Sequence, residues 1–586
     1  MTHALLAAHL NPVAMRHAHR HVVAKTVAEL AHEGLWAPTP DGDRWSLRVG
    51  DVDYGFRAGR HSLDHWQVDP ASLRCVVDGE EVEPDALRLV ADLAPLVGMD
   101  DATTPVYLEE VSSTLAAHAW KVAHQRFSAH ELVDASFQEV EAAMTEGHPG
   151  FVANSGRIGF GVDDHSAYAP EAGPRVALEW LAVRRTKAHL STGADITEAS
   201  LYAELLGDRV GTFEQHLRDL GEDAADFLFM ACHPWQWTNK VTTTLAPDVA
   251  RRDVVHVGTT EPVWQPQQSL RTFLDVEHPE RPYVKTSLSI QNMGFVRGLS
   301  PKYMRGTPAI NDWVAGVVAD DPVLQEAGFS VLREFAAVGY SGDVYHSLGF
   351  PNGHQTLLSC LWRESPVPRL QGGERLATMA SLLHRDTEGG AFVAELVAAS
   401  GVGGRRWLRA YLDAYLLPVV HCLLRHDLAF MPHGENLILV LRDHVPVRVV
   451  IKDIGEEVCL MGDTPLPAEA ERIRQDVPEH LKGLSLLVDV LDGFLRHLAA
   501  TMHEAGVLDA DTFWREVAQV VLDHRAAHPE LELQAKRYDL FRPRIERSCL
   551  NRLQLRNPKQ MVDLADQAQS LILEGTLANP LAPFGP

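Results

Sequence analysis

The spacing of the hydrophobic residues changes along the chain and divides it into three regions. In the first region, apolar residues recur every three or four positions over residues 14–34, 83–98 and 110–145, which is typical of amphipathic helices. Polar and apolar residues alternate over residues 44–59, and this alternation predicts a small hairpin. We therefore expect a mainly helical first domain at residues 1–170.

The second region contains short apolar runs rich in β-branched and aromatic residues, which are typical of strands. These runs lie at residues 175–183, 226–235, 253–258, 268–276 and 283–290. A helical segment follows at residues 307–321, where we expect Thr307 as the N-cap and Pro308 at the first helical position. The pattern predicts a second domain with an antiparallel sheet at residues 171–390.

Helical spacing returns in the third region, where a hairpin interrupts it. The predicted helices lie at residues 405–427, 479–505 and 511–526, and the predicted strand pair lies at residues 437–453 with its turn near residues 442–446. We expect a helical third domain at residues 391–586 that contains this hairpin. The whole chain is predicted to have an α+β fold.

The composition excludes some classes of partner. The 586 residues are 46% hydrophobic and 23% charged, which is ordinary for a globular protein. The formal net charge of −26 repels DNA and anionic lipid, so neither a nucleic acid nor a membrane is expected as a partner. An anionic small-molecule substrate would therefore need a local basic pocket.

Further features of the sequence indicate the cellular compartment. None of the six cysteines lies in a CxxC pair, which argues against a zinc site and a disulfide framework. The N-terminal apolar patch precedes a His/Arg cluster, the reverse of a signal peptide, and no run of about 18 apolar residues occurs. We expect a cytoplasmic protein. His17 and His21 are spaced like metal ligands but lack a carboxylate near them in sequence, so we expect surface histidines.

Charged and polar residues lie at the start and the end of the predicted hairpin. His433, Glu435 and Asn436 precede its first strand, and Lys452 and Asp453 end its second. The oxygens of Asn436 and Asp453 would meet at one end of the sheet, which suits Mg²⁺ bound to nucleotide phosphates. Kinase-like phosphotransferases use a comparable Asn and Asp.

A structural explanation of the same hairpin stays open. The hairpin could be capped, with a salt bridge from Lys452 to Glu435 or Glu456. Because strand alternation turns Lys452 away from Asp453, we expect Lys452 in a structural salt bridge.

A second polar group could form a polyphosphate cradle. Its candidate ligands are Ser269, Arg271, Thr272, Lys285, Thr286, Ser287, Asn292 and Arg297. Because side chains alternate along a strand, Ser269 and Arg271 would share one face of their strand. Lys285, Ser287 and Ser289 would share one face of the next. Arg binds phosphate as a fork and Lys as a point charge. The structural alternative is a solvated strand face with surface ion pairs.

Two loops contain further candidates. Residues 145–161 include His148 and the glycine-flanked Arg157, and loops on a rigid scaffold often contribute functional residues. A lone His or Arg in a loop is more often ordinary. Residues 232–240 are expected to be mainly structural, with two tryptophans in the core and His233 and Gln236 supporting a site.

Taken together, these segments resemble the IucA/IucC-type, NRPS-independent siderophore (NIS) synthetases. The similarity extends from about residue 100 to about residue 500 in ordered blocks. The blocks are "EGHP…GRIGFG", "HPWQW", "QQSLRTF", "YVKTSLSIQNMGFVRGLSP", "TPAINDW", "LWRESP", "ERLATMASL", "MPHGENLILVL" and "IKDIGEE". The sequences of these blocks are most similar to those of desferrioxamine E synthetase-like members, which join hydroxamate monomers.

The chain departs from the family pattern at three positions. Members that act on citrate have a second His and a Lys after "EGHP", whereas this chain has Phe151 and Ser155 there. This departure argues against citrate as the acyl donor. A family threonine is replaced by Met293, and Thr272 or Ser287 could substitute for its hydroxyl.

The resemblance implies an ATP-dependent acid–amine ligase with a cupped-hand fold of thumb, fingers and palm, usually a homodimer. A substrate carboxylate would attack the α-phosphate of ATP and release pyrophosphate, and an amine would then displace AMP. The implied nucleotide ligands are Ser269, Arg271, Thr272, Lys285, Arg297, His433, Glu435, Asn436 and Asp453, with Mg²⁺ on Asp453 and Glu435. The implied catalytic residues are Arg297, Lys285, His433, His148 and Arg157. His148 and Arg157 would lie near the acyl substrate, and His148 is a candidate base.

We therefore expect an enzyme that condenses and macrocyclises N-hydroxy-N-succinyl-diamine units, such as those of cadaverine, into a desferrioxamine-like siderophore. Its small-molecule partner would be a hydroxamate monomer with a free amine and a free carboxylate. Three alternatives stay open. They are a synthetase for a different, citrate-derived carboxylate, a kinase-like phosphotransferase, and a siderophore-binding protein without turnover.

Overall fold

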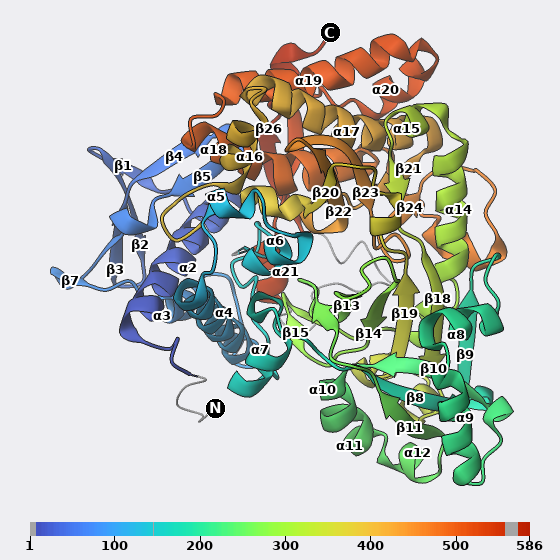
Figure 1. Ribbon diagram of the computed structural model, residues 1–586. Helices are drawn as coiled ribbons and strands as arrows, with labels where there is room; N and C mark the ends of the chain where they lie inside the picture. Colours follow the sequence, from blue (N-terminus) through green and yellow to red (C-terminus); the bar gives the residue numbers. More distant parts are fainter. Residues whose placement is uncertain (1–6, 145, 557–571) are drawn as a thin grey trace.

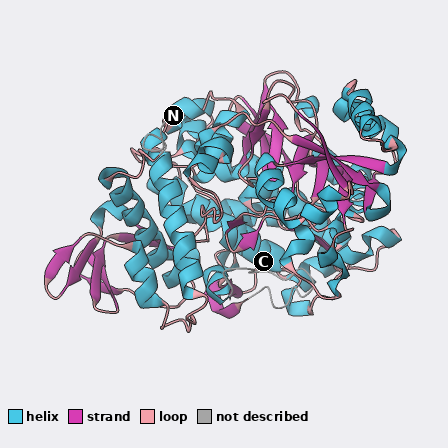
Figure 2. Cartoon of the chain, turned by 90° about the horizontal axis from the view of Figure 1, so that it is seen from below, coloured by secondary structure: helices cyan, strands magenta, loops and turns pink. Residues whose placement is uncertain are grey.

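The computed structural model describes residues 7–144, 146–556 and 572–586, and it confirms the α+β class. In Figure 1 a small blue sheet lies at the left edge, orange and red helices lie at the top, and larger sheets lie toward the lower right. Seen from below, a small group of strands lies at one end and larger sheets lie at the other (Figure 2). Within the described ranges, none of the helices has an apolar stretch long enough to span a bilayer. The six cysteines are free thiols.

The first region packs helices against a five-stranded antiparallel sheet of order β1-β2-β3-β6-β7. The helices are α2 (Pro12–His32), α3 (Ala86–Leu93) and α4 (Thr104–His124). The strands are β1 (Thr39–Asp41), β2 (Arg44–Val49), β3 (Val52–Phe56), β6 (Arg74–Val77) and β7 (Glu80–Val82), with β4 (Ala58–His61) and β5 (His65–Val68) as a separate hairpin. The helices predicted at residues 14–34 and 83–98 and the hairpin at residues 44–59 are confirmed.

The helix predicted at residues 110–145 is wrong as a single element. Helix α4 ends at His124, and α5 (Ala129–Leu132) and α6 (Phe137–Ala143) follow as separate short helices. Ser128 and Ser136 each begin a new helix through a capping box with a glutamate three residues later. These caps divide an apolar pattern that periodicity alone would continue.

The second region is built on a six-stranded antiparallel sheet of order β12-β13-β14-β19-β18-β9. Its strands are β9 (Ala188–Thr192), β12 (Trp264–Pro266), β13 (Thr272–Asp275), β14 (Tyr283–Thr286), β18 (Glu334–Tyr340) and β19 (Ser359–Arg363). A second sheet contains β8 (Glu179–Arg184), β10 (Phe227–Cys232) and β11 (Val254–Thr259). Phe229 of the second sheet and Trp362 of the first belong to one hydrophobic core, so the two sheets pack together.

Two strand boundaries differ from the prediction. Strand β13 begins at Thr272, after Ser269 and Arg271, because Leu270 has a left-handed φ of 67° and the chain turns there. Strand β14 ends at Thr286, before Ser287. The predicted shared strand faces of Ser269 with Arg271, and of Lys285 with the two serines, are therefore wrong.

A four-stranded sheet of order β17-β23-β22-β20 combines strands from the second and the third region, and helices from both regions surround it. Its strands are β17 (Ser330–Val331), β20 (Glu374–Thr378), β22 (Leu437–Arg442) and β23 (Val445–Ile451). The main helices are α14 (Thr307–Asp320), α15 (Pro322–Glu326), α16 (Phe392–Ser400), α17 (Gly404–His426), α18 (Arg496–Glu504) and α19 (Ala510–Ala527). The predicted hairpin is confirmed, and Asp443 and His444 join its strands with positive φ angles of 51° and 64°. Two such residues are typical of a type I′ turn.

Two helix starts are corrected. The helix predicted at residues 479–505 begins regularly at Ser485 as a π-helical segment that continues into α18. Thr307 is the first residue of α14 and Gly306 is its cap, so Thr307 is not the N-cap. The Thr307 hydroxyl donates to the Tyr303 carbonyl instead.

The division into domains at residues 170 and 390 stays a prediction. Helix α6 lies against β20, and Arg375 on that strand donates to the Val133 carbonyl at 2.9 Å. Elements from the first and the second predicted domain therefore share a contact surface.

Candidate functional site

A buried cluster of charges lies where the six-stranded sheet meets the hairpin β22–β23. Lys285 on β14 and Arg363 on β19 lie on neighbouring strands, and Asp453 follows β23 by two residues. The Lys285 Nζ atom is 2.6 Å from Asp453 Oδ1, and the Arg363 Nη1 atom is 3.0 Å from Oδ2. Glu334 on β18 lies 3.6 Å from the same lysine. The fold thus joins two predicted site residues, Lys285 and Asp453.

Opposite charges stabilise the ionised forms in this cluster. Burial alone would raise the pKa of the Asp453 carboxyl, but Lys285 and Arg363 hold that pKa well below its ordinary value. Burial alone would lower the pKa of Lys285, but Asp453 and Glu334 raise it. Removing one partner of such a buried pair leaves an uncompensated charge, which costs about 3–5 kcal/mol.

Unusual backbone angles lie beside the predicted ligands. Leu270 precedes Arg271 and has a φ of 67°, Met293 lies four residues before Arg297 with a φ of 52°, and Asp453 itself has a φ of 61°. Left-handed non-glycine residues cost of the order of 1–3 kcal/mol and concentrate at functional sites.

Arg271 and Arg297, which are half-buried, differ from the buried Lys285 and Arg363 in their partners. Arg271 donates to the Gly298 carbonyl, and Arg297 donates to the Asn292 carbonyl at 3.1 Å and to its side-chain oxygen at 2.6 Å. Among the described residues no ion pair joins either arginine to a carboxylate, and the Nε atom of each is buried without a hydrogen-bond partner. Desolvation and then the nearby Arg271 lower the pKa of Arg297 to about 10, so it stays charged at neutral pH.

The glycine whose carbonyl accepts from Arg271, Gly298, permits the close approach of Thr356. A side chain at Gly298 would collide with Thr356, so the chain can run this closely only without a Cβ atom.

The turn that precedes β22 contributes a neutral histidine. The Asn436 side-chain amide donates to the Met431 carbonyl at 3.0 Å, lies 3.1 Å from His433 Nε2 and also contacts Glu457. The His433 proton is therefore on Nδ1, which is buried without a partner among the described residues. Burial lowers the pKa of His433 and raises that of Glu457 to about 8.

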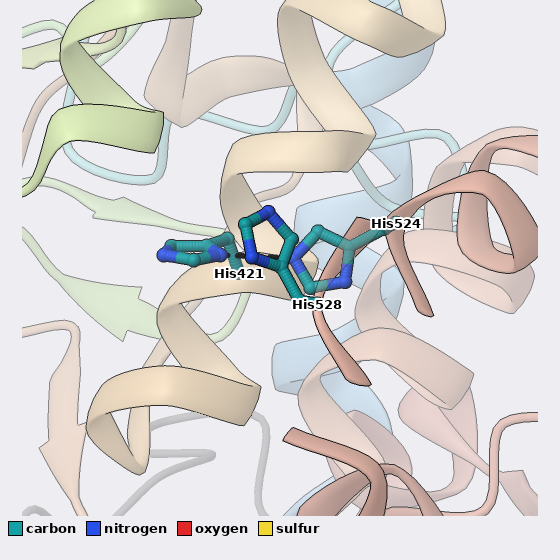
Figure 3. Close-up of side chains that lie close together, drawn as sticks. All are labelled: His421, His524 and His528. Atoms are coloured by element: carbon teal, nitrogen blue, oxygen red, sulfur yellow. Dashed lines mark hydrogen bonds between the residues drawn. The ribbon is translucent and has the colours of Figure 1, made fainter. Parts of the chain in front are cut away.

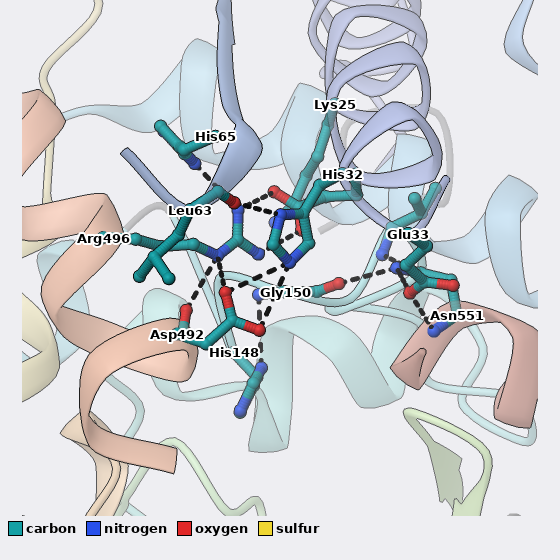
Figure 4. Close-up of polar contacts among 12 residues, drawn as sticks. Lys25, His32, Glu33, Leu63, His65, His148, Gly150, Asp492, Arg496 and Asn551 are labelled. Carbon is teal, nitrogen blue, oxygen red and sulfur yellow. Dashed lines mark hydrogen bonds and ion pairs between the residues drawn. The ribbon is translucent and has the colours of Figure 1, made fainter. Parts of the chain in front are cut away.

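His148 lies next to His433. Their rings meet edge to face with centroids 5.6 Å apart, and Gly150 N donates to His148 Nδ1 at 3.2 Å. Burial, then the nearby His433, holds the pKa of His148 well below its ordinary value. Figure 4 shows His148 beside a buried network in which Arg496 joins His65 at 2.8 Å and Asp492 at 3.2 Å.

A cavity of about 1010 Å³ adjoins the loop that contains His148. Glu146 and Pro149 of that loop line it, together with Lys25 and Glu29 of α2. The Lys25 ammonium is 2.6 Å from the Glu146 carboxylate. The cavity therefore has charged residues in its lining and lies close to His148.

Arg157 lies apart from the charge cluster. It forms a two-pronged ion pair with Glu171 at 2.7 and 2.8 Å, and both side chains are buried. Its remaining side-chain contact within the described ranges is the Ser155 carbonyl. The loop position predicted for His148 and Arg157 is confirmed for residues 146–161, but the fold brings only His148 to the other predicted residues.

The predicted hydroxyl ligands are bound within the protein. The Ser269 hydroxyl donates to Thr272 Oγ1 at 2.8 Å, and Thr272 is buried on β13. The buried Ser287 hydroxyl accepts from Leu299 N at 3.2 Å and from Ser359 N at 3.0 Å, which indicates a structural brace.

Lys452 and Glu435 both lie near the charge cluster, but the predicted orientation of Lys452 is not observed. Lys452 Nζ lies 3.7 Å from Asp453 Oδ2, so the expectation that it turns away from Asp453 is wrong. The reason is that β23 ends at Ile451 and strand alternation ends with it. Glu435 is half-buried and acts electrostatically on Arg297 and His433.

The "HPWQW" segment makes structural contacts, and its role in supporting a site stays a prediction. The fully buried Gln236 donates to Ser289 Oγ at 3.0 Å and accepts from Ser289 N at 2.8 Å. His233 caps the short helix that follows it.

Sequence reasoning missed Arg363, Glu334 and Glu457 as members of the site. Arg363 occurs in the quoted "LWRESP" block and Glu457 ends the quoted "IKDIGEE" block, so the resemblance contained a signal for both. Glu334 lies in a buried apolar strand without such a signal.

Comparison with known sequences identifies related proteins. Residues 136–384 match the IucA / IucC family, and residues 405–563 match a family described as ferric iron reductase FhuF-like transporter. The putrebactin synthase of Shewanella sp. (strain MR-4) is 42% identical over 99% of this chain and 94% of its own length.

Comparison with solved structures gives the same fold. The aerobactin synthetase IucC of a hypervirulent Klebsiella pneumoniae pathotype superimposes with a TM-score of 0.85 at 27% identity, over 97% of this chain and 98% of its own. ATP-bound aerobactin synthetase IucA of the same pathotype superimposes with a TM-score of 0.72 at 18% identity, over 96% and 99%. The cupped-hand synthetase fold is therefore confirmed.

Proposed function

We propose a reaction for this protein on the premise that the chain belongs to the IucA/IucC family. It is accordingly a ligase of siderophore biosynthesis. We propose that it uses ATP to activate a carboxylate as an acyl-adenylate and then forms an amide with an amine, releasing AMP and pyrophosphate. A structural relative with this fold has been solved with ATP bound, which supports the choice of nucleotide.

The observation that carries the proposal is the pair of half-buried guanidinium groups of Arg271 and Arg297, which have no carboxylate partner among the described residues. In the first step a carboxylate oxygen attacks the α-phosphorus, and the bond to the bridging oxygen of pyrophosphate breaks. Both reactants are anions, so the step requires cations placed in advance. Among the described residues, no carboxylate pairs with Arg271 or Arg297, as expected for groups that bind a phosphate when it is present.

His433 and His148 fit the role of neutral hydrogen-bond donors in this reaction. Hydrogen bonds from Asn436 and Gly150 occupy one ring nitrogen of each, which leaves the proton on the other. We therefore assign His433 Nδ1–H to a phosphate oxygen and His148 Nε2–H to the acyl group. In this assignment His148 positions the substrate and does not act as the base.

Mg²⁺ fits this site through Asp453. Such an ion is commonly held by one or two carboxylates together with substrate phosphates, and it neutralises the charge that develops on them. Among the described residues, neither Asp453 nor Glu435 belongs to a group of three possible metal ligands, so the phosphates would complete the coordination. Lys285 and Arg363 hold the Asp453 carboxylate in its ionised form.

The amine-bearing substrate is assigned to the cavity beside His148. Its volume of about 1010 Å³ can hold a long flexible chain.

The acyl group is proposed to be a hydroxamate monomer that ends in a simple carboxylate, such as a succinyl unit. Phe151 and Met293 stand at two of the positions where this chain departs from the family pattern, and both belong to one apolar cluster. The Phe151 ring also meets the His148 ring edge to face with centroids 5.0 Å apart. An apolar wall next to His148 suits a methylene chain better than the carboxylates of citrate. Closeness to the desferrioxamine branch and macrocyclic products remain proposals.

A product panel tests this substrate assignment. Purified protein with ATP and Mg²⁺ is given N-hydroxy-N-succinyl-diamines of several chain lengths and, separately, citrate with the same amines. We expect mass spectra to show linear and cyclic oligomers of the hydroxamate monomers and no citryl amides. Citryl amides as the main product would contradict the assignment of the acyl site.

Binding of ATP is expected to weaken as pH rises through about 8. Burial, and then the Asp453 charge, raises the pKa of Glu457 to about 8, so this carboxyl is mostly neutral at pH 7. Its ionisation adds a negative charge beside His433 and Asn436. Repulsion of about 1 kcal/mol from a partly screened charge raises the Kd for ATP about fivefold.

The matched variant for this pH effect is Glu457→Gln, which stays neutral. Calorimetric titration of ATP avoids interference from the amine substrate, which has its own pKa. The Kd of the variant is expected to change little over the interval in which that of the wild type rises. An equal rise in both proteins would exclude Glu457 as the cause.

A further inference from the structure

Four histidines and one aspartate gather in the third region, among residues without a role in the proposed reaction. His421 and His426 lie on α17, His524 lies on α19, and His528 directly follows α19. Asp321 is the N-cap of α15 and lies against the first two. Figure 3 shows His421, His524 and His528 with their rings turned toward one another.

The carboxylate of Asp321 determines the proton position on His421. His421 Nε2 is 3.1 Å from Asp321 Oδ2, and a carboxylate only accepts hydrogen bonds. His421 Nε2 therefore carries the proton of the neutral ring, and its Nδ1 presents a lone pair. That Nδ1 lies 2.9 Å from His524 Nε2.

The same reasoning applies to His528. Its Nδ1 lies 3.1 Å from a Glu530 oxygen, so the proton of the neutral ring is on Nδ1 and the lone pair is on Nε2. Two of the three rings thus donate their N–H to a carboxylate, as histidine ligands of metals usually do.

His524 supplies an independent observation. It is 3% exposed, and its Nδ1 atom is buried without a hydrogen-bond partner among the described residues. When His524 Nε2 donates to His421 Nδ1, the one lone pair of the neutral His524 ring lies on Nδ1, where it is buried and unsatisfied, which is unfavourable. A cation that binds this lone pair removes that cost.

The geometry is close to that of a three-histidine metal site. One ligand atom from each of His421, His524 and His528 lies within 4.8 Å of the others. Zinc–nitrogen bonds of about 2.0–2.1 Å in a tetrahedron place the nitrogens about 3.3 Å apart. Side-chain adjustments of about an ångström reach that spacing.

We propose that His421, His524 and His528 bind a divalent transition-metal ion of the zinc class. Imidazole ligands suit zinc and its neighbours in the first row, whereas Mg²⁺ requires oxygen ligands. Three protein ligands leave a fourth position for water. The ion would join α17 to the end of α19 and stabilise the folded state in proportion to metal concentration.

Metal binding is tested on untagged full-length protein after treatment with a chelator. Zn²⁺ is titrated against a chromophoric competitor, with Fe²⁺ and Mg²⁺ as parallel probes. We expect one equivalent of Zn²⁺, weaker Fe²⁺ binding and no Mg²⁺ binding at this position. His524→Gln and His528→Gln should each lower the affinity for Zn²⁺ by at least about 100-fold.

The control is His130→Gln, which is largely exposed and belongs to none of the groups of possible metal ligands among the described residues. It should change Zn²⁺ affinity by no more than a few-fold. Because His528 is partly exposed, its variant is expected to fold, and its melting temperature should no longer rise on addition of Zn²⁺. No Zn²⁺ binding by the wild type, or equal binding by wild type and His528→Gln, would overturn the proposal.

Discussion

Asp453→Asn is expected to lower kcat by on the order of 10³ and to lower the free energy of unfolding by about 3–5 kcal/mol. The substitution removes the charge that Lys285 and Arg363 share at 2.6 and 3.0 Å, and both cations are buried. It also removes the carboxylate proposed to hold Mg²⁺. Asparagine accepts a left-handed φ as aspartate does, so the backbone angle of 61° is not the cause of the loss.

Asp443→Asn is the matched control for this change. Asp443 lies in the turn of the same hairpin, has a similar φ of 51° and is exposed. Its replacement should leave both activity and stability nearly unchanged. Activity is measured at equal concentrations of folded protein, with urea denaturation giving the stability. Near-wild-type turnover of folded Asp453→Asn would remove this carboxylate from the reaction.

Arg297→Ala is expected to reduce kcat by about 10²–10³ while the fold stays intact. Arg297 is only half-buried and its hydrogen bonds go to Asn292 alone, so its loss leaves no buried charge without a partner. Arg297→Lys should recover only part of the rate, since an ammonium group cannot bind two phosphate oxygens as a fork.

Arg281→Ala serves as the control for Arg297. Arg281 follows β13 and precedes β14 in the same sheet, and it is about half exposed. Single-turnover kinetics separate the chemical step from product release. Melting temperatures that agree within about 2 °C would show that the fold is unchanged. An Arg297→Ala enzyme with an unchanged chemical step would exclude this residue from phosphate activation.

Local patterns predicted the elements whose partners are near in sequence. The hairpin at residues 437–453 and the helices at residues 405–427 and 511–526 follow from periodicity and from a turn of two residues. The helix predicted at residues 110–145 failed because capping at Ser128 and Ser136 overrides periodicity.

Contacts between distant residues could not be predicted in this way. Arg363 joins Asp453 across 90 positions only because β19 pairs with β14, and that pairing depends on the whole sheet. His21, expected at the surface without a carboxylate, meets Glu146 at 2.6 Å. Arg157 was a reasonable candidate from its loop, but Glu171 binds it in a buried pair.

The family resemblance identified most residues of the charge cluster. Hydrophobic periodicity could not identify them. The resemblance named Lys285, Arg297, His433 and Asp453, which the fold brings to one end of the two sheets. It did not show which cations would be paired. That distinction separates Arg271 and Arg297, without carboxylate partners among the described residues, from Lys285 and Arg363.

The central claim is that a substrate carboxylate attacks the α-phosphorus of ATP. It is tested most directly with a hydroxamate monomer whose carboxylate is labelled with ¹⁸O. If the acyl-adenylate forms, one labelled oxygen leaves with AMP when the amine attacks, and pyrophosphate stays unlabelled. Mass spectrometry of the nucleotide products should therefore show ¹⁸O in AMP. Label in inorganic phosphate together with ADP would contradict the account.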